Sequence, residues 1–388
     1  MIRSPNEFSS FLDSLKKYCQ NKLIPREAEV ELLDEVPPDI VADMAGFGLF
    51  GFSIPEAYGG FGMTTEELVL AAMEISQCSV AFRARVGTNT GIGSEALVAD
   101  GSEAQKEKYL PRLASGEITG CFAITEPDAG SDAASLKTTA RKEGNDFVLN
   151  GTKCFITNAP ISDLFTVMAR TDQSKPKADG VSAFLIERNT PGLTVGSPYR
   201  KMGQAGSPVS EVHFENCRIP ASNLIGIEGA GFKTAMKVLD RGRLHISAVS
   251  CGMAHRIIEE ATAYARDRKQ FGKAIGEFQL IQAMLADSQA ELLAGWSLVQ
   301  DVAQRFDGKP AHVSDPDVSM RVSCAKLFCT EMVGRVADRG VQVHGGAGYI
   351  NEYPVERFYR DVRLLRLYEG TTQIQQLIIG RELLRQAS

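Results

Sequence analysis

Several features that would identify other classes of protein are missing from this sequence. No apolar stretch approaches the roughly 20 residues that a helix needs to span a bilayer. The amino terminus, MIRSPNEFSSFLDSLKKY, is polar and has no apolar signal core. The eight cysteines are scattered without a CxxC pair, which indicates buried reduced thiols rather than a disulfide framework or a zinc site. We therefore expect a cytoplasmic protein, or one of an organelle matrix, without membrane insertion.

Motifs of several enzyme classes are also missing. The sequence has no GxSxG nucleophile elbow and no P-loop, which argues against hydrolases and nucleoside triphosphatases. Its histidines are dispersed, and none pairs with histidine or cysteine at metal-ligand spacing, so we predict no metal site. Residues 46–51 match GxGxxG letter for letter, but a helix-like stretch precedes them where a dinucleotide-binding fingerprint needs a strand. We therefore do not predict a Rossmann fold.

The bulk composition is typical of a soluble globular protein with two or three domains. A chain of 388 residues exceeds one ordinary core, and 44% hydrophobic with 23% charged residues is usual for globular proteins. The net charge of −6 argues against a surface for nucleic acid or anionic membrane. The arginine-rich run at 357–366 is interrupted by Asp361 and flanked by Glu356 and Glu369, so we expect local ion pairing there.

The apolar pattern changes twice along the chain. Apolar residues from Phe8 to Tyr18 recur at helical spacing, and we predict that residues 1–118 are helical. Strand-like runs fill residues 119–226, with a tight hairpin turn expected at Asn150-Gly151. Long helical segments return over residues 227–388. The sequence therefore predicts an α+β multidomain protein in which a β domain lies between two helical domains.

Three segments are rich in groups that can contact a ligand. In CFAITEPDAGSD (121–132), hydroxyl and backbone N–H groups could contact a ring or a phosphate, although an ordinary polar turn has the same composition. In QVHGGAGY (342–349), adjacent glycines either allow the close approach of a ligand or end a helix. In LYEGTTQIQ (367–375), Thr372 and Gln375 form a capping-box pattern that leaves Glu369 in a short loop before a helix. A surface carboxylate near a helix end explains Glu369 equally well.

Together these segments resemble the acyl-CoA dehydrogenase family. ITEPDAGSD, R-x-x-FG at Arg268–Gly272, QVHGG and YEGTTQIQ follow one another in the family's order and at about its spacing, over essentially the whole chain. The resemblance implies an amino-terminal helical domain, a middle β-barrel or sandwich domain and a carboxy-terminal four-helix bundle. It also implies FAD as cofactor, a homotetramer, an acyl-CoA substrate and an electron-transferring flavoprotein as electron acceptor.

The resemblance assigns roles to residues by position. Contacts to the flavin of the same subunit are expected from Phe122, Ile124, Thr125, Gly130, Ser131, Phe155, Ile156 and Thr157. Contacts to the FAD of a neighbouring subunit are expected from Arg268, Gln279, Gln342, Val343, His344, Gly345 and Gly346. Further FAD contacts are expected from Thr371 and Gln373. Acyl-CoA contacts are expected from Ser131, Met236, Asp240, Arg243 and Gly370.

Glu369 matches the position of the family's usual catalytic base. A minority of members carry the base on the helix near Asp240–Arg243, but that position corresponds to Gly242 here, so one candidate remains. The resemblance then implies desaturation between the second and third acyl carbons. In that reaction Glu369 removes the proton next to the thioester, hydride passes to flavin N5, and the Glu369 N–H holds the thioester oxygen.

Arg83 bears on the identity of the acyl group. It resembles the arginine with which glutaryl-CoA dehydrogenases hold a terminal carboxylate, which favours a short-chain or dicarboxylic substrate. Gly87 stands where those enzymes have serine, and Arg85 replaces a small residue. Alternatively, Arg83 pairs with a protein carboxylate such as Glu95 and never meets the substrate.

Two other functions are compatible with the same fold. Acyl-CoA oxidases and related flavoproteins share it, but the oxidases are usually longer than this chain. A non-catalytic acyl-CoA-binding protein would be expected to lose the base or the flavin contacts, and this sequence keeps both.

Overall fold

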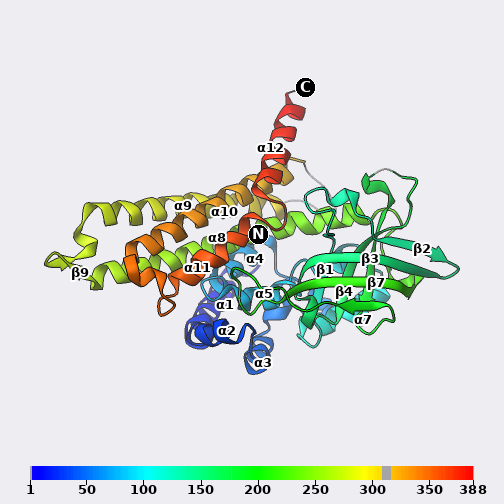
Figure 1. Cartoon of the computed structure of the whole chain (residues 1–388), viewed down its shortest axis with the longest axis horizontal. Coiled ribbons are helices and arrows are strands. Elements are labelled where there is room, and N and C mark those ends of the chain that lie inside the picture. The colour runs from blue at the N-terminus through cyan, green and yellow to red at the C-terminus, as the bar shows by residue number, and fades with distance from the viewer. Residues whose placement is uncertain (1, 176, 308–315, 388) are drawn as a thin grey trace.

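The chain forms three structural parts that follow one another along the sequence (Figure 1). The computed structural model describes residues 2–175, 177–307 and 316–387. The first part is helical, the second is a β-sheet and the third consists of long helices, which confirms the predicted fold class. The large sheet lies between Gly120 and Ile225. The domain boundaries at residues 118 and 226 stay a proposal. Within the described ranges, no helix combines the length and the apolar character needed to cross a membrane.

The amino-terminal part packs around a compact apolar core that includes Leu15, Met44 and Phe82. Its α-helices are α1 (Pro5–Tyr18), α2 (Glu27–Leu33), α3 (Pro38–Phe47), α4 (Thr65–Ile75), α5 (Val80–Gly87), α6 (Glu95–Asp100) and α7 (Glu103–Ala114). As predicted for the GxGxxG match, a helix rather than a strand precedes Gly48, which ends α3 with a left-handed φ of 85°.

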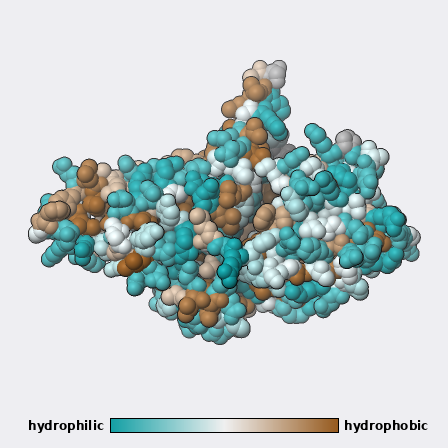
Figure 2. Space-filling view, viewed as in Figure 1, coloured by the Kyte–Doolittle hydropathy of each residue, from teal (hydrophilic) through white to brown (hydrophobic). Residues whose placement is uncertain are grey.

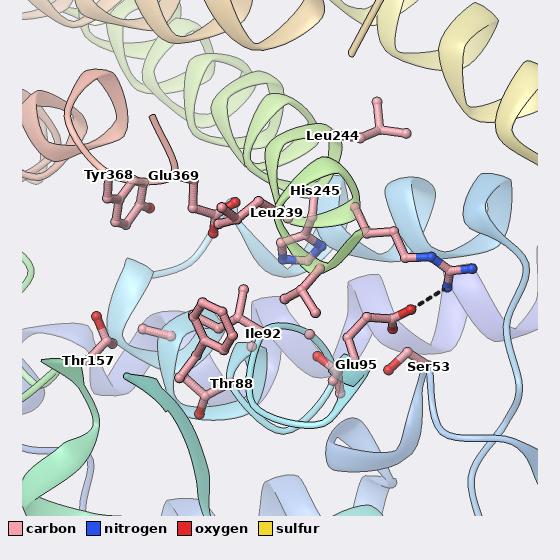
Figure 3. A pocket seen from close by; sticks show the side chains of 18 of the residues that line it. Ser53, Thr88, Ile92, Glu95, Thr157, Leu239, Leu244, His245, Tyr368 and Glu369 are labelled. Carbon is pink, nitrogen blue, oxygen red and sulfur yellow. Dashed lines mark ion pairs between the residues drawn. The ribbon is translucent and has the colours of Figure 1, made fainter. Parts of the chain in front are cut away.

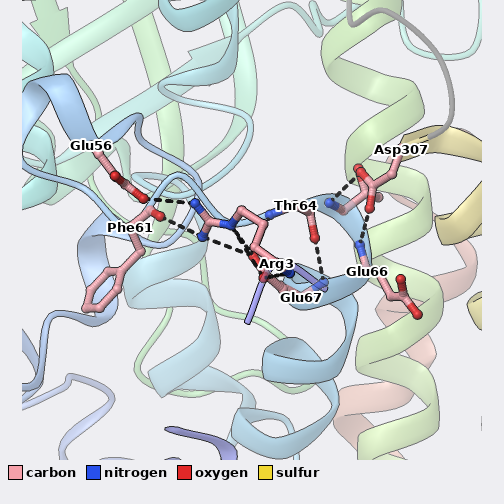
Figure 4. Close-up of polar contacts among 8 residues, drawn as sticks. Arg3, Glu56, Phe61, Thr64, Glu66, Glu67 and Asp307 are labelled. Carbon is pink, nitrogen blue, oxygen red and sulfur yellow. Dashed lines mark hydrogen bonds and ion pairs between the residues drawn. The ribbon is translucent and has the colours of Figure 1, made fainter. Parts of the chain in front are cut away.

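Helix α4 joins the amino-terminal part to the carboxy-terminal helices (Figure 4). Thr64 and Glu67 form a capping box at its start. Asp307, the last residue of α9, accepts hydrogen bonds from the N–H groups of Thr65 at 2.8 Å and Glu66 at 3.0 Å. Arg3 also donates to the Glu67 carboxylate, so the start of the chain is held at the same helix end.

The middle part is one twisted sheet with mostly antiparallel pairing. Its strands are β1 (Gly120–Ala123), β2 (Thr139–Glu143), β3 (Asp146–Thr157), β4 (Leu164–Arg170), β5 (Val181–Glu187), β6 (Leu193–Val195), β7 (Val209–Pro220) and β8 (Leu224–Ile225). The strand order is β6-β7-β3-β2-β4-β5-β8, and β1 pairs in parallel with β4.

The hairpin turn predicted at Asn150-Gly151 is wrong. These residues lie inside the continuous strand β3, where the register with β7 shifts between Leu149 and Gly151. The turn instead lies between Glu143 and Asp146, which pair across β2 and β3. A side chain on Gly151 would overlap Thr138. Glycine is therefore required here because β3 forms a β-bulge and its backbone passes close to Thr138, not because the chain turns.

A buried ion pair fixes the segment that follows β1. Lys153 on β3 is fully buried and donates to Glu126 at 2.7 Å and to the Ile124 carbonyl at 3.1 Å. Glu126 also accepts hydrogen bonds from the N–H groups of Lys137 and Thr138. Burial raises the pKa of Glu126, but Lys153 and these donors outweigh it and the pKa is lowered overall. The pair therefore anchors the start of ITEPDAGSD to the sheet.

The carboxy-terminal part is built on long helices with a shared apolar core. Its elements are α8 (Gly231–Asp267), β9 (Lys269–Gln270), β10 (Lys273–Ala274), α9 (Gln279–Asp307), α10 (Pro316–His344), α11 (Val355–Val362) and α12 (Thr372–Gln386). Helix α8 has 37 residues, and at a rise of about 1.5 Å per residue it is about 55 Å long. Helix α12 starts beside α10 and then projects away from the body of the molecule (Figure 1).

The arginine-rich run at 357–366 is largely paired with carboxylates, but of the local pairing that was predicted the structure shows only Arg360 with Glu356 within the described residues. Its pairs are Arg357 with Glu27, Arg360 with Glu31 and Glu356, and Arg366 with Glu331. Most of these carboxylates come from α2 and α10 rather than from the run itself, so the pairs also join distant elements. All eight cysteines are free and seven of them are buried, which agrees with the predicted reduced thiols.

We predict that Lys153→Met lowers the stability of the middle domain by about 3–5 kcal/mol, because it leaves Glu126 buried without a counter-charge. The measurement is the urea midpoint of the unfolding transition. The double variant Lys153→Met with Glu126→Gln also removes the unpaired carboxylate, so it should recover much of the lost stability. If the double variant is no more stable than Lys153→Met, the charge pair is not the cause.

Candidate active site

A cavity of about 170 Å³ lies where the three parts of the chain meet. We call it the central pocket. Its lining comes from β1, from β3, from α5 and the segment after it, from α8 and from the loop before α12. Figure 3 shows Glu369 on one side of this pocket, His245 near its middle and Glu95 with Ser53 on the far side. The pocket thus unites the first and third motifs of the sequence.

The loop that carries Glu369 is held in a left-handed conformation. Glu369 has a φ of 55° and Gly370 a φ of 90°. The Glu369 carbonyl accepts hydrogen bonds from Arg243 Nε at 3.1 Å and Gln375 Nε2 at 3.3 Å. The Gly370 carbonyl accepts from Lys326 Nζ at 2.7 Å and from Gln375 at 3.0 Å. These donors stabilise a backbone shape that a residue with a side chain seldom adopts.

The capping box predicted at Thr372 and Gln375 is wrong by one residue. Thr371 is the N-cap of α12, and its hydroxyl accepts from the N–H of Ile374. Thr372 instead donates to Glu331 at 2.6 Å. The side chain of Gln375 donates to the carbonyls of Glu369 and Gly370 in the preceding loop. It therefore does not form the second hydrogen bond of a capping box. The prediction that Glu369 lies in a short loop ahead of a helix is correct.

Glu369 is partly buried, and one of its carboxylate oxygens is shielded without a partner in the described part of the chain. Its Oε2 is shielded from solvent and has no hydrogen-bond partner within the described residues. Burial raises the pKa of Glu369, while the charges of Arg83, Lys326 and Arg243 act against that rise without cancelling it. The N–H of Glu369 also donates to no group in the described chain. The residue therefore offers both a poised base and a free donor to a ligand.

Gly242 on α8 faces this carboxylate. A methyl group there would overlap Oε2 of Glu369 and lie 2.9 Å from its Cδ. The helix position that carries the base in a minority of family members is thus the position that makes room for Glu369 here.

The wall opposite the base fits a flat aromatic ring. Phe122, Ile124, Thr125, Phe155, Ile156 and Thr157 all line the central pocket, and their contacts to a flavin stay predictions. Phe155 is 67% exposed although it is aromatic and borders a cavity. The hydroxyls of Thr125 and Thr157 have no hydrogen-bond partner within the described residues. An uncovered aromatic face beside unused hydroxyls is a surface that an isoalloxazine ring would cover.

The predicted contacts to a neighbouring subunit's FAD form a second, separate site. Arg268, Gln279 and Val343 to Gly346 line one broad groove at the far end of α8, which we call the tip groove. Gln342 is exposed on the adjoining end of α10. Arg268 follows Gly242 by 26 residues on or beside α8, which is about 39 Å along the helix axis. One side chain cannot bridge that distance to the central pocket.

Other predicted contacts lie outside the central pocket. Gly130, Ser131 and Gln373 are exposed. Met236 packs against the core between the sheet and α8. Asp240 pairs with Arg243 at 2.8 Å and accepts a hydrogen bond from Ser319 at 2.9 Å. Their contacts to FAD or acyl-CoA stay predictions.

Arg83 points into the central pocket, but its predicted protein partner is wrong. Glu95 pairs with Arg241 of α8 at 3.0 Å (Figure 3), because α8 brings that guanidinium across α6. Arg83 instead donates from Nε to Nε2 of His245 at 3.1 Å. Burial, and then the charge of Arg83, lower the pKa of His245 well below 6.5, so the imidazole is neutral and can accept. Arg83 has no ion pair within the described chain.

Three functional residues were not found from the sequence. His245 and Lys326 make contacts at the site but lie inside long helical patterns, and Gln375 was noticed only as part of a capping box. A lysine or glutamine at a core-facing helical position is the signal that could have found Lys326 and Gln375, since both are fully buried.

Profiles of the acyl-CoA dehydrogenase family match the N-terminal domain at residues 5–117, the middle domain at 121–217 and the C-terminal domain at 229–384. An acyl-CoA dehydrogenase of Bacillus subtilis (strain 168) is 40% identical over 370 residues, 95% of this chain and 96% of that protein. The caffeyl-CoA reductase–Etf complex subunit CarC of Acetobacterium woodii is 39% identical over 380 residues, 94% and 98% of the two chains. The structure of butyryl-CoA dehydrogenase from Megasphaera elsdenii superposes with a TM-score of 0.91 at 34% identity and covers 97% and 98%.

A buried glutamate facing a wall fit for a flavin, on this order of domains, defines a flavin-dependent oxidoreductase. The chain belongs to the acyl-CoA dehydrogenase family. Its members are FAD-dependent enzymes that act on CH–CH bonds, which confirms the predicted enzyme class and cofactor.

We predict that Gly242→Ala slows the reduction of bound flavin by acyl-CoA about a hundredfold, because the new methyl group displaces the Glu369 carboxylate by the order of 1 Å. The rate is measured anaerobically by loss of flavin absorbance. Gly380→Ala is the matched control, because it adds a methyl group to a helix where no atom lies within 4 Å. Equal rates in both variants would contradict the close approach at Gly242.

Proposed function

We propose that this protein removes two hydrogens from an acyl-CoA between its second and third carbons, with Glu369 as the base. The observation that carries the proposal is the Glu369 carboxylate, whose shielded Oε2 has no hydrogen-bond partner among the described residues, in a pocket that Phe155 and Thr157 also line. In this proposal the flavin lies against Phe155 and Thr157, and the acyl thioester lies between the flavin and Glu369.

Glu369 takes the proton from the carbon next to the thioester. That proton is weakly acidic, so the base works best with a pKa raised toward the operating pH, which burial supplies here. The free N–H of Glu369 can donate to the thioester oxygen and stabilise the charge that develops there. Bound FAD supplies the acceptor for the hydride that leaves the third carbon.

Arg83 supports a substrate with an anionic or polar end. It lines the same pocket as Glu369, it donates to neutral His245, and it has no ion pair within the described residues. A guanidinium without a counter-ion costs free energy when water is excluded. Gly87 leaves room beside it, since a Cβ there would lie 3.4 Å from Arg83 Nε. We propose a short dicarboxylic acyl-CoA, with glutaryl-CoA as the reference compound.

We also propose a homotetramer in the cytoplasm that passes electrons to an electron-transferring flavoprotein. The tip groove supports the assembly, because it gathers predicted FAD contacts far from the central pocket of the same chain. Exposed apolar residues at that end include Phe271 and Leu280, and Figure 2 shows hydrophobic surface there and along α12. The relative from Acetobacterium woodii belongs to a reductase–Etf complex, which supports the electron acceptor.

We predict that Glu369→Gln still binds FAD and acyl-CoA but reduces flavin about a thousandfold more slowly, because the base is gone. Because the pKa of Glu369 is raised above 4.5, the wild-type rate should rise with pH through that higher pKa as the base ionises. Glu369→Gln should lose this dependence. Glu369→Asp keeps a shorter carboxylate, so its rate of flavin reduction should lie between those of the wild type and Glu369→Gln. Full activity in Glu369→Gln would mean that another residue is the base.

We predict that glutaryl-CoA reduces the flavin with a higher kcat/KM than pentanoyl-CoA, which has the same number of carbons. Arg83→Met should remove this preference by lowering kcat/KM for glutaryl-CoA about a hundredfold, since the terminal carboxylate loses its counter-charge. Arg85→Met is the control, because Arg85 lies on the same helix but donates to Thr119 outside the pocket. The absence of any preference in the wild type would rule out the dicarboxylic substrate. If no member of a panel of acyl-CoA compounds bleaches the flavin, the proposed dehydrogenase activity is ruled out.

A further inference from the structure

Lys326 on α10 is a charged side chain in an unusual place. Its exposed fraction is 0%, yet it forms no ion pair within the described residues. Its Nζ donates to the backbone carbonyl of Gly370 at 2.7 Å. Burying a cation without a counter-ion costs several kcal/mol, roughly, so stability alone does not explain a lysine here. A neutral donor could make the same hydrogen bond.

We propose that Lys326 is a positioning residue of the reaction, which holds the Gly370 carbonyl and so fixes the segment that carries the base, while its charge keeps Glu369 ionisable. The inference rests on the proposed role of Glu369. Lys326 touches neither the substrate nor the flavin wall of the central pocket, and it acts only through its neighbours.

The geometry divides this role into two parts. Gln375 also donates to Gly370, at 3.0 Å, so the hydrogen bond of Lys326 is shared with a neutral amide. The charge is not shared in that way. It acts on the carboxylate of Glu369 from the side of α10, while Arg243 acts from α8 and Arg83 from α5.

The surrounding charges are consistent with this role. Burial lowers the pKa of Lys326 to about 8, the carboxylates of Glu369 and Glu331 act to raise it, and Arg243 acts to lower it. The lysine therefore stays charged at neutral pH. Burial raises the pKa of Glu369, and without this cation that pKa would rise further. Glu369 would then be protonated over more of the working pH range.

The test compares Lys326→Met, which removes donor and charge, with Lys326→Gln, which keeps a donor. Each is assayed with the acyl-CoA that bleaches the wild-type flavin fastest. In Lys326→Met, flavin reduction at pH 6 should be about tenfold slower, and the acid limb should move up by about one pH unit. The half-saturating acyl-CoA concentration and the FAD content should stay unchanged. In Lys326→Gln the rate of flavin reduction at high pH should return toward that of the wild type, but the acid limb of the pH profile should stay shifted to higher pH.

Thr330→Val is the matched control. Thr330 is buried one turn along α10 and bonds only within that helix, to the Lys326 carbonyl at 2.8 Å. It should leave the pH profile in place. If both lysine variants give the profile of Thr330→Val, the lysine is merely structural and the inference is overturned.

A second readout needs no turnover. Ionisation of Glu369 beside the flavin should change the flavin absorbance with pH, and Glu369→Gln identifies that change by removing it. The pH midpoint of this absorbance change should be higher in Lys326→Gln than in the wild type and unchanged in Thr330→Val. An unchanged midpoint in Lys326→Gln overturns the inference. Failure of every acyl-CoA to bleach the wild type would instead overturn the proposed function, and this midpoint would still decide the role of Lys326.

Discussion

The left-handed backbone at Glu369 is the constraint on which the site depends. A residue with a side chain pays about 1–3 kcal/mol to sit at such an angle, so the surrounding structure must hold it there. Arg243 comes from α8, Lys326 from α10 and Gln375 from α12, and all three donate to the two carbonyls of the loop. The convergence of three helices on one dipeptide explains why the carboxy-terminal helices and the base form a single unit.

Charge balance at Glu369 follows from the same arrangement. Burial raises the pKa of the Glu369 carboxyl group, and the charges of Arg83, Lys326 and Arg243 limit that rise. The cations are themselves restrained: Arg243 is paired with Asp240, and Arg83 is bonded to a neutral histidine. None of them forms an ion pair with Glu369, which would fix the carboxylate and block its approach to a substrate. The base is therefore both ionisable and unoccupied.

The sequence predicted the order of the domains, because that order follows from local patterns and from the order of the motifs. The role of Glu369 as the base stays a prediction. Prediction from the sequence failed where a residue's role is set by elements far away in the chain. Asn150-Gly151 has the composition of a turn, but its pairing with β7 turns it into a bulge. Arg83 and Glu95 are close in sequence, but α8 supplies Arg241 to the glutamate and His245 to the arginine. Lys326 could not be identified, since its partner lies 44 residues further along the chain.

The two groups of predicted FAD contacts have a consequence for the assembly. The central pocket of one chain is lined by Glu369 and by one group of the predicted flavin contacts, whereas the tip groove lies about 39 Å away along α8. A single chain in the proposed assembly therefore supplies only part of each cofactor site. Cofactor binding and subunit association then stabilise each other by mass action, because each completes a surface that the other needs. The loop that carries Glu369 is positioned by interactions within one chain, whereas in the proposed homotetramer the binding of FAD would also depend on a second chain.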